Sequence, residues 1–72
     1  MFTDMANNKL LLLDTVIIPT LRNTIYSHKG RIIAMRWYYD DDGIERQRVK
    51  ILFTDDSEKW YETDKVVKFH EV

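Results

Sequence analysis

Two stretches of the chain alternate between apolar and polar residues with a period of two. The apolar odd positions of the first stretch, Arg31–Tyr39, are Ile33, Met35 and Trp37. Those of the second stretch, Glu45–Thr54, are Val49, Ile51 and Phe53. This period is typical of strands with one buried and one solvent-exposed face. We therefore expect two antiparallel strands, with Trp37 and Phe53 among the residues that face the core.

The segment Asp40–Gly43 between these stretches predicts a tight turn, because Asp and Gly are strong turn formers. A two-residue loop would place Met35 opposite Arg48 and mix core with solvent positions. A three-residue loop places Met35 opposite Val49 and gives Gly43 the left-handed position such loops need. We expect this second register. Its other pairs are Ile33 with Ile51, Arg36 with Arg48, and Tyr38 with Arg46.

Shorter elements flank this hairpin. Leu10–Ile18 ends in β-branched residues, which favour a strand that Pro19 ends, although its leucines also fit a helix. Leu21–Lys29 is expected to be a connecting loop. The later elements are expected to be a turn at Thr54–Ser57, a strand at Glu58–Glu62, a helical turn at Thr63–Lys65 and a strand at Val66–Phe69.

These elements predict an all-β fold of four to five short antiparallel strands. So few strands cannot cover a flat sheet in 72 residues, so we expect the sheet to curl into a small barrel. Residues 14–72 would form this barrel. Residues 1–13 would form an N-terminal arm or a short helix.

Composition narrows the class of protein. Apolar residues make up 44% of the chain and charged residues 32%, which is typical of one globular domain. The net charge of −1 excludes a generally basic nucleic-acid coat, but not a local basic face. The absence of Cys excludes disulfides and thiolate chemistry. Leu10–Leu13 is far shorter than the ~20 apolar residues of a membrane span, and Met1–Asp4 does not resemble a signal peptide, so we expect an intracellular protein.

Several segments together resemble the Tudor-like members of the small SH3-like barrels. The first is Gly30-Arg31-Ile32-Ile33-Ala34, which is followed by an acidic hairpin. The next segments are Val49-Lys50-Ile51-Leu52-Phe53-Thr54-Asp55-Asp56-Ser57, then Trp60-Tyr61, and then Val66. In this group a strand ending in such an acidic turn precedes a strand with a large aromatic residue, and a short helical turn leads to a closing strand. Other SH3-like modules, such as KOW and chromo-barrel domains, fit the pattern nearly as well.

The resemblance implies a function as well as a fold. Tudor-like domains bind methylated Lys or Arg in an aromatic cage. Phe53 and Asp55 fall at positions that match cage residues, and Trp60 and Tyr61 are further candidates. The resemblance thus implies a reader of proteins or peptides, with an aromatic pocket formed by Phe53, Asp55, Trp60 and Tyr61.

The expected register also gathers a basic face. Arg36, Arg46, Arg48 and Lys50 converge with Tyr38 on the solvent side of the hairpin. The face is either a solvated surface that prevents edge association or the site of an anionic partner. Phosphates with bases stacked on Tyr38, an acidic protein surface, and acidic residues of this chain are the alternatives.

No sequence pattern points to catalysis. His28 and His70 are the only histidines, and neither belongs to a Ser or carboxylate arrangement. Asp40–Asp42 lacks the later Glu and the spacing of a calcium loop, so turn formation explains it better than a metal site. We therefore expect a non-enzymatic binding module without a metal or cofactor. The alternatives are a nucleic-acid-binding or transcription-accessory protein, and a small phage-type inhibitor of a host enzyme.

Two further expectations concern packing. Four adjacent leucines at Leu10–Leu13 cannot all face one core from a strand, so we expect either a helix that covers the barrel or a homodimer through this segment. A tight turn at Asp56-Ser57 would place Phe53 opposite Trp60 in the core and Tyr61 on the outer face. Trp60 would then matter for folding and Tyr61 for binding. A three-residue turn would exchange these roles.

Overall fold

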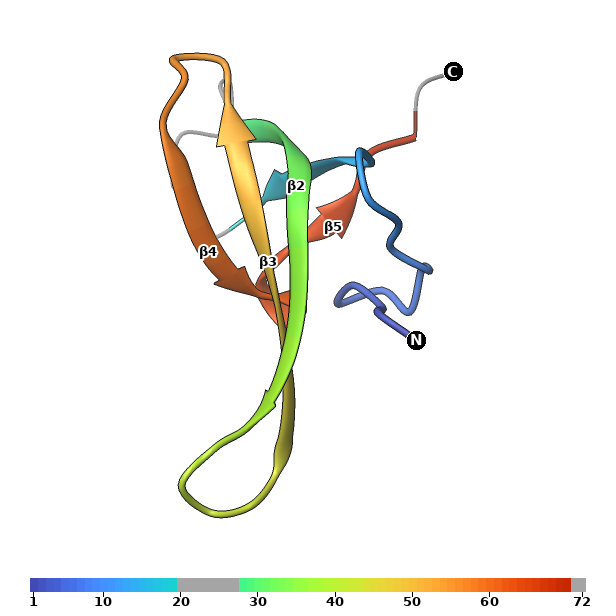
Figure 1. Ribbon diagram of the computed structural model, residues 1–72. Coiled ribbons are helices and arrows are strands. Elements are labelled where there is room, and N and C mark those ends of the chain that lie inside the picture. The colour runs from blue at the N-terminus through green and yellow to red at the C-terminus, as the bar shows by residue number, and fades with distance from the viewer. Residues whose placement is uncertain (20–27, 71–72) are drawn as a thin grey trace.

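The computed structural model describes residues 1–19 and 28–70, and the described part forms one antiparallel sheet of five strands in the order β4-β3-β2-β1-β5 (Figure 1). The strands are β1 (Thr15–Ile18), β2 (His28–Tyr39), β3 (Glu45–Phe53), β4 (Glu58–Glu62) and β5 (Val67–Lys68). A 3-10 turn, η2 (Thr63–Lys65), links β4 to β5. Of the loop expected over Leu21–Lys29, residues 21–27 lie outside the described residues, whereas His28 and Lys29 belong to β2 and not to a loop.

The all-β class and the antiparallel meander are therefore confirmed. β1 ends at Ile18, directly before Pro19, and β4 and η2 have the predicted bounds. The sheet curls strongly, with β1 and β5 lying across the direction of β3 (Figure 1). It does not close into the barrel expected from the sequence, because β4 and β5 are its two edges and no ladder joins them in the described part of the chain. No described helix is long and apolar enough to cross a membrane.

The register of the β2–β3 hairpin follows the three-residue loop. Met35 lies opposite Val49, and Gly43 closes the turn with a φ of 75°. The prediction that Ile33 lies opposite Ile51 is wrong. The ladder shifts between Ile32 and Ala34, so that Ile32 takes the place opposite Ile51 and is fully buried. A β-bulge adds one residue to one strand, so residues an odd number of positions apart across the bulge face the same side of the sheet. Ile32 and Met35 are three positions apart across it, and both therefore face the core.

Trp37 is not a core residue as expected, since 57% of its surface is exposed. It follows Met35 on the core-facing side of β2, but the core ends before it. Within β2, the pairing with β1 covers only His28–Arg31, so the far half of the hairpin projects beyond the body of the protein (Figure 1). Alternation therefore predicted the face of Trp37 correctly and its burial wrongly.

The second turn is longer than expected. Two backbone hydrogen bonds close this turn. The Phe53 N–H donates to the Ser57 carbonyl, and the Asp56 N–H donates to the Phe53 carbonyl. The loop is thus Thr54–Asp56, with Asp56 in the left-handed region at a φ of 67°. Tyr61 consequently lies opposite Val49 on the core side, and Trp60 lies opposite Lys50 on the outer side. The predicted pairing of Phe53 with Trp60 is wrong, and the roles of Trp60 and Tyr61 are exchanged.

The core is a small apolar cluster formed by β1, β2 and β3 together with two residues outside the strands, Leu10 and Val66. Its fully buried members are Leu10, Val16, Ile18, Ile32, Val49, Ile51 and Val66, and Phe53 is nearly as buried. Phe2, Met35 and Tyr61 pack against its margin. Phe53 is thus a core residue, as predicted.

Residues 1–13, expected to be an arm or a short helix, fold back as a loop on the sheet. Thr3 and Lys9 form an isolated bridge, and the Met5 N–H donates to the Val66 carbonyl. Leu10 enters the core, whereas Leu11, Leu12 and Leu13 are exposed and Leu13 has a φ of 73°. A helix over Leu10–Leu13 is therefore wrong, and association through this segment stays a prediction.

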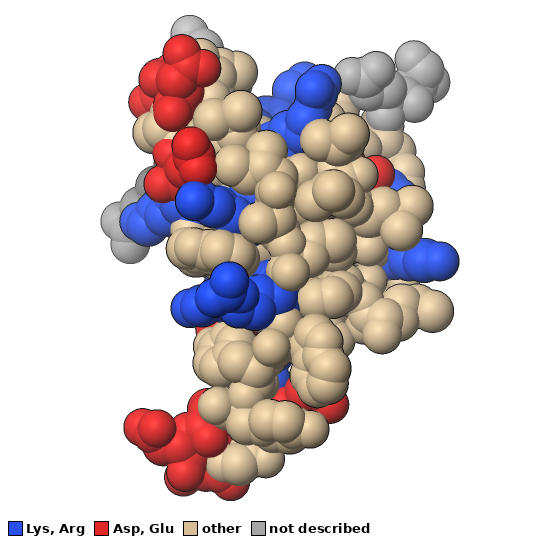
Figure 2. Space-filling view, viewed as in Figure 1, with Lys and Arg blue, Asp and Glu red and all other residues tan. Residues whose placement is uncertain are grey.

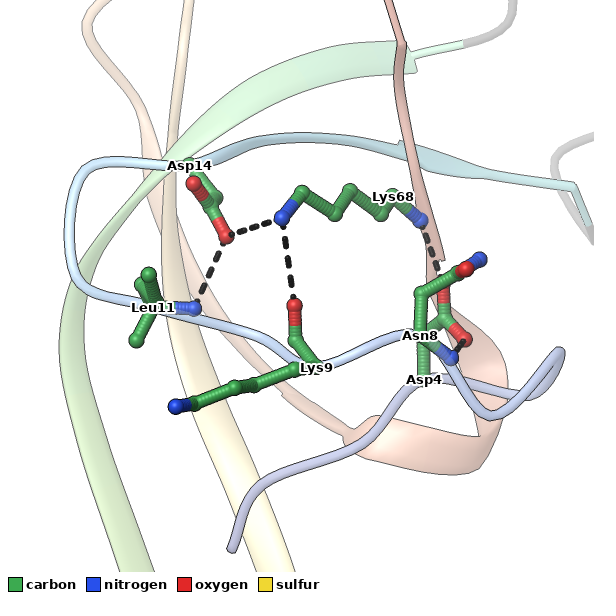
Figure 3. Close-up of polar contacts among 6 residues, drawn as sticks. All are labelled: Asp4, Asn8, Lys9, Leu11, Asp14 and Lys68. Atoms are coloured by element: carbon green, nitrogen blue, oxygen red, sulfur yellow. Dashed lines mark hydrogen bonds and ion pairs between the residues drawn. The ribbon is translucent and has the colours of Figure 1, made fainter.

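The Asp4 side chain holds this loop in place (Figure 3). Its carboxylate accepts hydrogen bonds from the backbone N–H groups of Ala6 (2.9 Å), Asn8 (2.8 Å) and Lys68 (2.7 Å). The Asn8 side-chain amide adds a fourth bond at 3.1 Å. Lys68 also binds Asp14, with 3.3 Å between its Nζ and Oδ2. A buried carboxylate thus ties the start of the chain to β5.

Glycine is required at position 30, where β2 is paired with a strand on each side. A Cβ at this position would lie 2.3 Å from Ile51 Cγ2 and 2.8 Å from the Leu52 carbonyl oxygen. Because the second contact is with backbone, Gly30→Ala is expected to lower the free energy of unfolding by about 1–3 kcal/mol, the usual range for overpacking. Urea denaturation measures this loss, with Gly43→Ala as a strained but open control. Equal stability of Gly30→Ala and the wild type would contradict the packing of β2 against β3.

Candidate functional site

The solvent-facing side of β2, β3 and β4 carries a continuous row of charged and aromatic side chains, which we call the outer face. The ladders place Arg36 opposite Arg48, Tyr38 opposite Arg46, and Lys50 opposite Trp60. Side chains on one face of a sheet alternate with those on the other, so these residues share one side. The outer face consists of Arg36, Tyr38, Arg46, Arg48, Lys50, Trp60 and Glu62.

Trp60 lies at the centre of the basic residues of this face. The Arg48 guanidinium carbon is 4.9 Å from the centre of the Trp60 ring, and Arg36 is 5.7 Å from it. Lys50 Nζ lies 5.9 Å from the same ring. Arg48 also lies 5.0 Å from the Tyr38 ring, so its guanidinium contacts two aromatic rings. Cation–π contacts of this kind hold the basic side chains in defined positions on the sheet.

The cations of the outer face differ in how they are neutralised. Arg46 is paired with Asp40 at 3.0 Å, and Lys50 with Glu58 at 3.0 Å. Within the described part of the chain, Arg36 and Arg48 form no ion pair although they lie directly opposite each other. Like charges in opposite positions of a ladder repel. Arg48 Nε is also buried and has no hydrogen-bond partner among the described residues. Because neither arginine forms an ion pair there, the two form a positive centre.

Two carboxylates border this positive centre. The Tyr38 hydroxyl donates a hydrogen bond to Glu62, and this bond is the main reason why the pKa of Tyr38 is raised. Glu62 lies opposite Arg48 in the β3–β4 ladder, so its charge offsets part of the positive field. At the turn, the Ile44 N–H and Arg46 hold the pKa of Asp40 below its ordinary value. In Figure 2, acidic side chains gather at the hairpin tip and near the β3–β4 turn, and basic side chains lie over the part of the molecule between them.

The residues of the expected aromatic pocket do not converge. Phe53 and Tyr61 contact each other edge-to-face on the core side, with 6.2 Å between ring centres. Trp60 is on the opposite face of β4. Asp55 stays in its turn, where Oδ1 accepts hydrogen bonds from the Ser57 N–H (3.0 Å) and hydroxyl (2.6 Å).

A separate pocket lies near the start of β2 and the end of β3, with a volume of about 250 Å³. Phe53 is the only aromatic side chain among its described lining residues. Nearby, Lys29 Nζ lies 4.3 Å from the centre of the Phe69 ring. The described lining therefore offers one ring to a cationic ligand, not a cage.

The acidic turn at Asp40–Gly43 is used for folding. Asp40 Oδ1 accepts the N–H groups of Asp42 and Ile44, each at 2.9 Å, and Oδ2 accepts Arg46. No group of three His, Cys, Asp or Glu side chains that could hold a metal ion occurs in the part of the chain that the structure describes. The turn interpretation of these aspartates is thus sufficient.

Comparison with models of protein families, with curated proteins and with solved structures found no significant match. The assignment of a role therefore rests on the outer face itself. Sequence reasoning placed Arg36, Arg46, Arg48, Lys50 and Tyr38 on this face, and the ladders confirm that placement. It missed the position of Trp60 on the outer face and the part played by Glu62. Both positions depend on the length of the Thr54–Asp56 turn, because this length sets the register of β4 against β3.

Proposed function

We propose that the protein is a non-enzymatic binding module that holds an acidic segment of a partner protein on the outer face. The observation that carries the proposal is the arginine pair Arg36 and Arg48, held against Trp60 and without an ion-pair partner in the described residues. A carboxylate can accept two hydrogen bonds from one guanidinium, which makes Arg suited to acidic ligands.

The composition of the surface favours a protein as the partner. Trp, Tyr and Arg are the residues that most often dominate the energy of protein interfaces. All three types meet here, at Trp60, Tyr38 and Arg48. Because aromatic contacts already hold the guanidinium of Arg48 in place, less side-chain entropy is lost on binding than at a mobile arginine.

The same geometry disfavours a reader of methylated residues at Trp60. Such a reader needs an aromatic ring with a free face for the ligand cation. Three cations of this protein already lie around the Trp60 ring. A methylated Lys would meet their repulsion, whereas a carboxylate would be attracted.

Single-stranded nucleic acid is the second candidate, because a base could stack on Trp60 while phosphates contact the arginines. With Arg46 and Lys50 paired to acids, Arg36 and Arg48 remain as the phosphate contacts. So few contacts give weak binding at physiological salt. We therefore regard single-stranded nucleic acid as a less favoured ligand than an acidic protein segment.

We propose that this curled but open sheet belongs to the SH3-like, Tudor-like family of small barrels. The support is the position of η2, a short helical turn that leads to a closing strand. β5 then lies beside β1, and β2 is shared between the two halves of the curled sheet.

Isothermal titration with a peptide of Glu and Tyr residues tests the proposed function. Arg36→Gln/Arg48→Gln is expected to weaken binding at least about tenfold, or ~1.4 kcal/mol. Lys59→Gln/Lys65→Gln removes the same charge from exposed positions off the outer face and is the matched control. Added salt is expected to weaken wild-type binding because the pairing is ionic.

The alternatives give different results in the same titration. Equal loss in the two double variants would indicate net charge, not the arginine pair, and would contradict the proposal. If an oligothymidylate bound more tightly than the acidic peptide, the ligand would be a nucleic acid. If a trimethyllysine peptide bound more tightly, the protein would be a reader of methylated residues.

A further inference from the structure

The projecting half of β2 has one open edge. β1 pairs with β2 only as far as Arg31, and the segment before β1 adds bonds to Ile32 from Leu13 and Asp14. From Met35 to Tyr39, β3 is the only strand beside β2 in the described part of the chain. The other side of this stretch pairs with no strand among residues 1–19 and 28–70.

The turn shows which backbone groups lie on that open edge. Asp40 exchanges hydrogen bonds with the closing residues of the turn, so its N–H and carbonyl point toward β3. Successive residues of a strand point their backbone groups to opposite sides. The N–H and carbonyl groups of Met35, Trp37 and Tyr39 therefore point to the open edge.

The side chains beside this edge are also uncovered. Trp37 and Tyr39 expose 57% and 65% of their surface and contact each other edge-to-face at 6.2 Å. Natural proteins protect such edges with charged side chains, especially Lys, and with Pro, bulges or short strands. Met35–Tyr39 has no Pro and no Lys, its one charged residue is Arg36 on the outer face, and its bulge lies before it, at Ile33.

We propose that two copies of the chain pair along this edge as an antiparallel, two-fold symmetric dimer. Trp37 lies opposite Trp37 of the second copy, and Met35 lies opposite Tyr39 of the second copy. In this register each pair exchanges both backbone bonds, because all three residues point to the edge. Each copy then pairs with the open edge of the other, so this edge is left free for no third copy and the assembly closes as a dimer.

The side chains of the edge favour a second copy over an unrelated strand. In this register the exposed Trp37 and Tyr39 of one copy lie on the same side of the joined sheets as Trp37 and Met35 of the other. Aromatic side chains in opposite positions of a ladder stabilise the pairing of two strands. The second copy therefore covers the same aromatic surface that it exposes itself.

The dimer is independent of the proposed ligand. It joins the sheets edge to edge and leaves Arg48 and Trp60 of each copy on the outer face. Loss of acidic-peptide binding would leave the dimer intact, and loss of the dimer would leave each arginine pair in place.

Sedimentation of the full chain over a range of concentrations tests the dimer. Trp37→Pro removes the edge N–H and adds a ring there, a change tolerated on an edge because that N–H serves no ladder bond in the monomer. We expect the wild type to dimerise and Trp37→Pro to weaken the dimer at least about tenfold. Trp37→Val keeps the N–H and is the control, with a smaller loss.

Hydrogen exchange on the wild type keeps the test decisive even if Trp37→Pro fails to fold. The amides of Met35, Trp37 and Tyr39 are expected to exchange more slowly as the protein concentration rises. A wild type that stays monomeric at millimolar concentration, a dimer that Trp37→Pro leaves intact, or open-ended aggregates would each contradict the proposal. So would concentration-independent exchange of these amides.

Discussion

Asp4→Ala is expected to lower the free energy of unfolding by about 3–5 kcal/mol, a large part of what a domain of this size can have. The Asp4 side chain is 4% exposed and accepts four hydrogen bonds. Removing the carboxylate leaves the N–H groups of Ala6, Asn8 and Lys68 without that acceptor. An unsatisfied donor costs roughly 1–3 kcal/mol where water cannot replace its acceptor. Asn8 and Lys68 are half-buried, whereas Ala6 is exposed, so most of the loss is expected from the first two.

The expected loss is not confined to the N-terminus. The loop that Asp4 closes carries Leu10 into the core and lies against Val66. When the loop opens, the contacts of Leu10 open with it. Thermal melts of Asp4→Ala and of Asp14→Ala, whose carboxylate is less buried, give the comparison. A loss of stability in Asp4→Ala no larger than in Asp14→Ala would contradict the role of Asp4.

The contribution of Asp4 is also expected to depend on pH. Burial acts to raise the pKa of its carboxyl, but the hydrogen bonds from Lys68, Asn8 and Ala6 outweigh burial and lower the pKa below 3.8. A depressed folded-state pKa stabilises the protein above the unfolded-state pKa, and this stabilisation is lost as pH falls through the folded-state value. Asp4→Asn cannot titrate, so its deficit relative to the wild type should shrink on acidification below the ordinary range of Asp. A deficit that stays constant with pH would contradict this linkage.

Tyr61→Ala is expected to destabilise the fold by about 3 kcal/mol, as is usual when an aromatic side chain is removed from a packed site. Tyr61 lies opposite Val49 and edge-to-face with Phe53, at the margin of the core. Trp60→Ala is expected to fold and to lose binding of the acidic peptide, because Trp60 lies on the outer face against Arg36 and Arg48.

The two variants are compared by thermal melts and by titration. Tyr61→Phe keeps the ring and is the control for stability, and Trp60→Phe keeps an aromatic surface for the arginines. A stable Tyr61→Ala beside an unfolded Trp60→Ala would mean that the Thr54–Asp56 turn is shorter than the structure has it.

The first hairpin could be predicted closely from the sequence. Period-two alternation on both strands left one register that kept core and solvent residues apart, and Gly43 fitted the left-handed position of its turn. The placement of Arg36, Arg48 and Tyr38 on one face followed from that register alone. Where two independent patterns constrain each other, little freedom remains.

The errors occurred where the sequence allowed two solutions of similar energy. Ile32 and Ile33 are both apolar, so either could face the core and the bulge left no trace in the pattern. Every residue of Thr54–Ser57 favours a turn, so its length stayed open and Trp60 and Tyr61 were assigned to the wrong faces.

Long-range contacts were the least predictable. Asp4 uses the same short-range turn bonds as Asp40 and Asp55, in which a carboxylate accepts N–H groups two to four residues along the chain. Its decisive partner, the Lys68 N–H, is 64 residues away. No local pattern encodes that distance. The burial of Trp37 was predicted wrongly for a related reason, because the extent of the core depends on where β1 ends.

Chemical-shift mapping with the acidic peptide tests the central claim, that the outer face binds a negatively charged segment of a protein. We predict saturable shifts at the Trp60 indole N–H and at Tyr38, Arg36 and Arg48, with little change at Phe53. Shifts centred instead on Lys29 and Phe53, at the pocket between β2 and β3, or no saturable shift on the outer face, would contradict the claim.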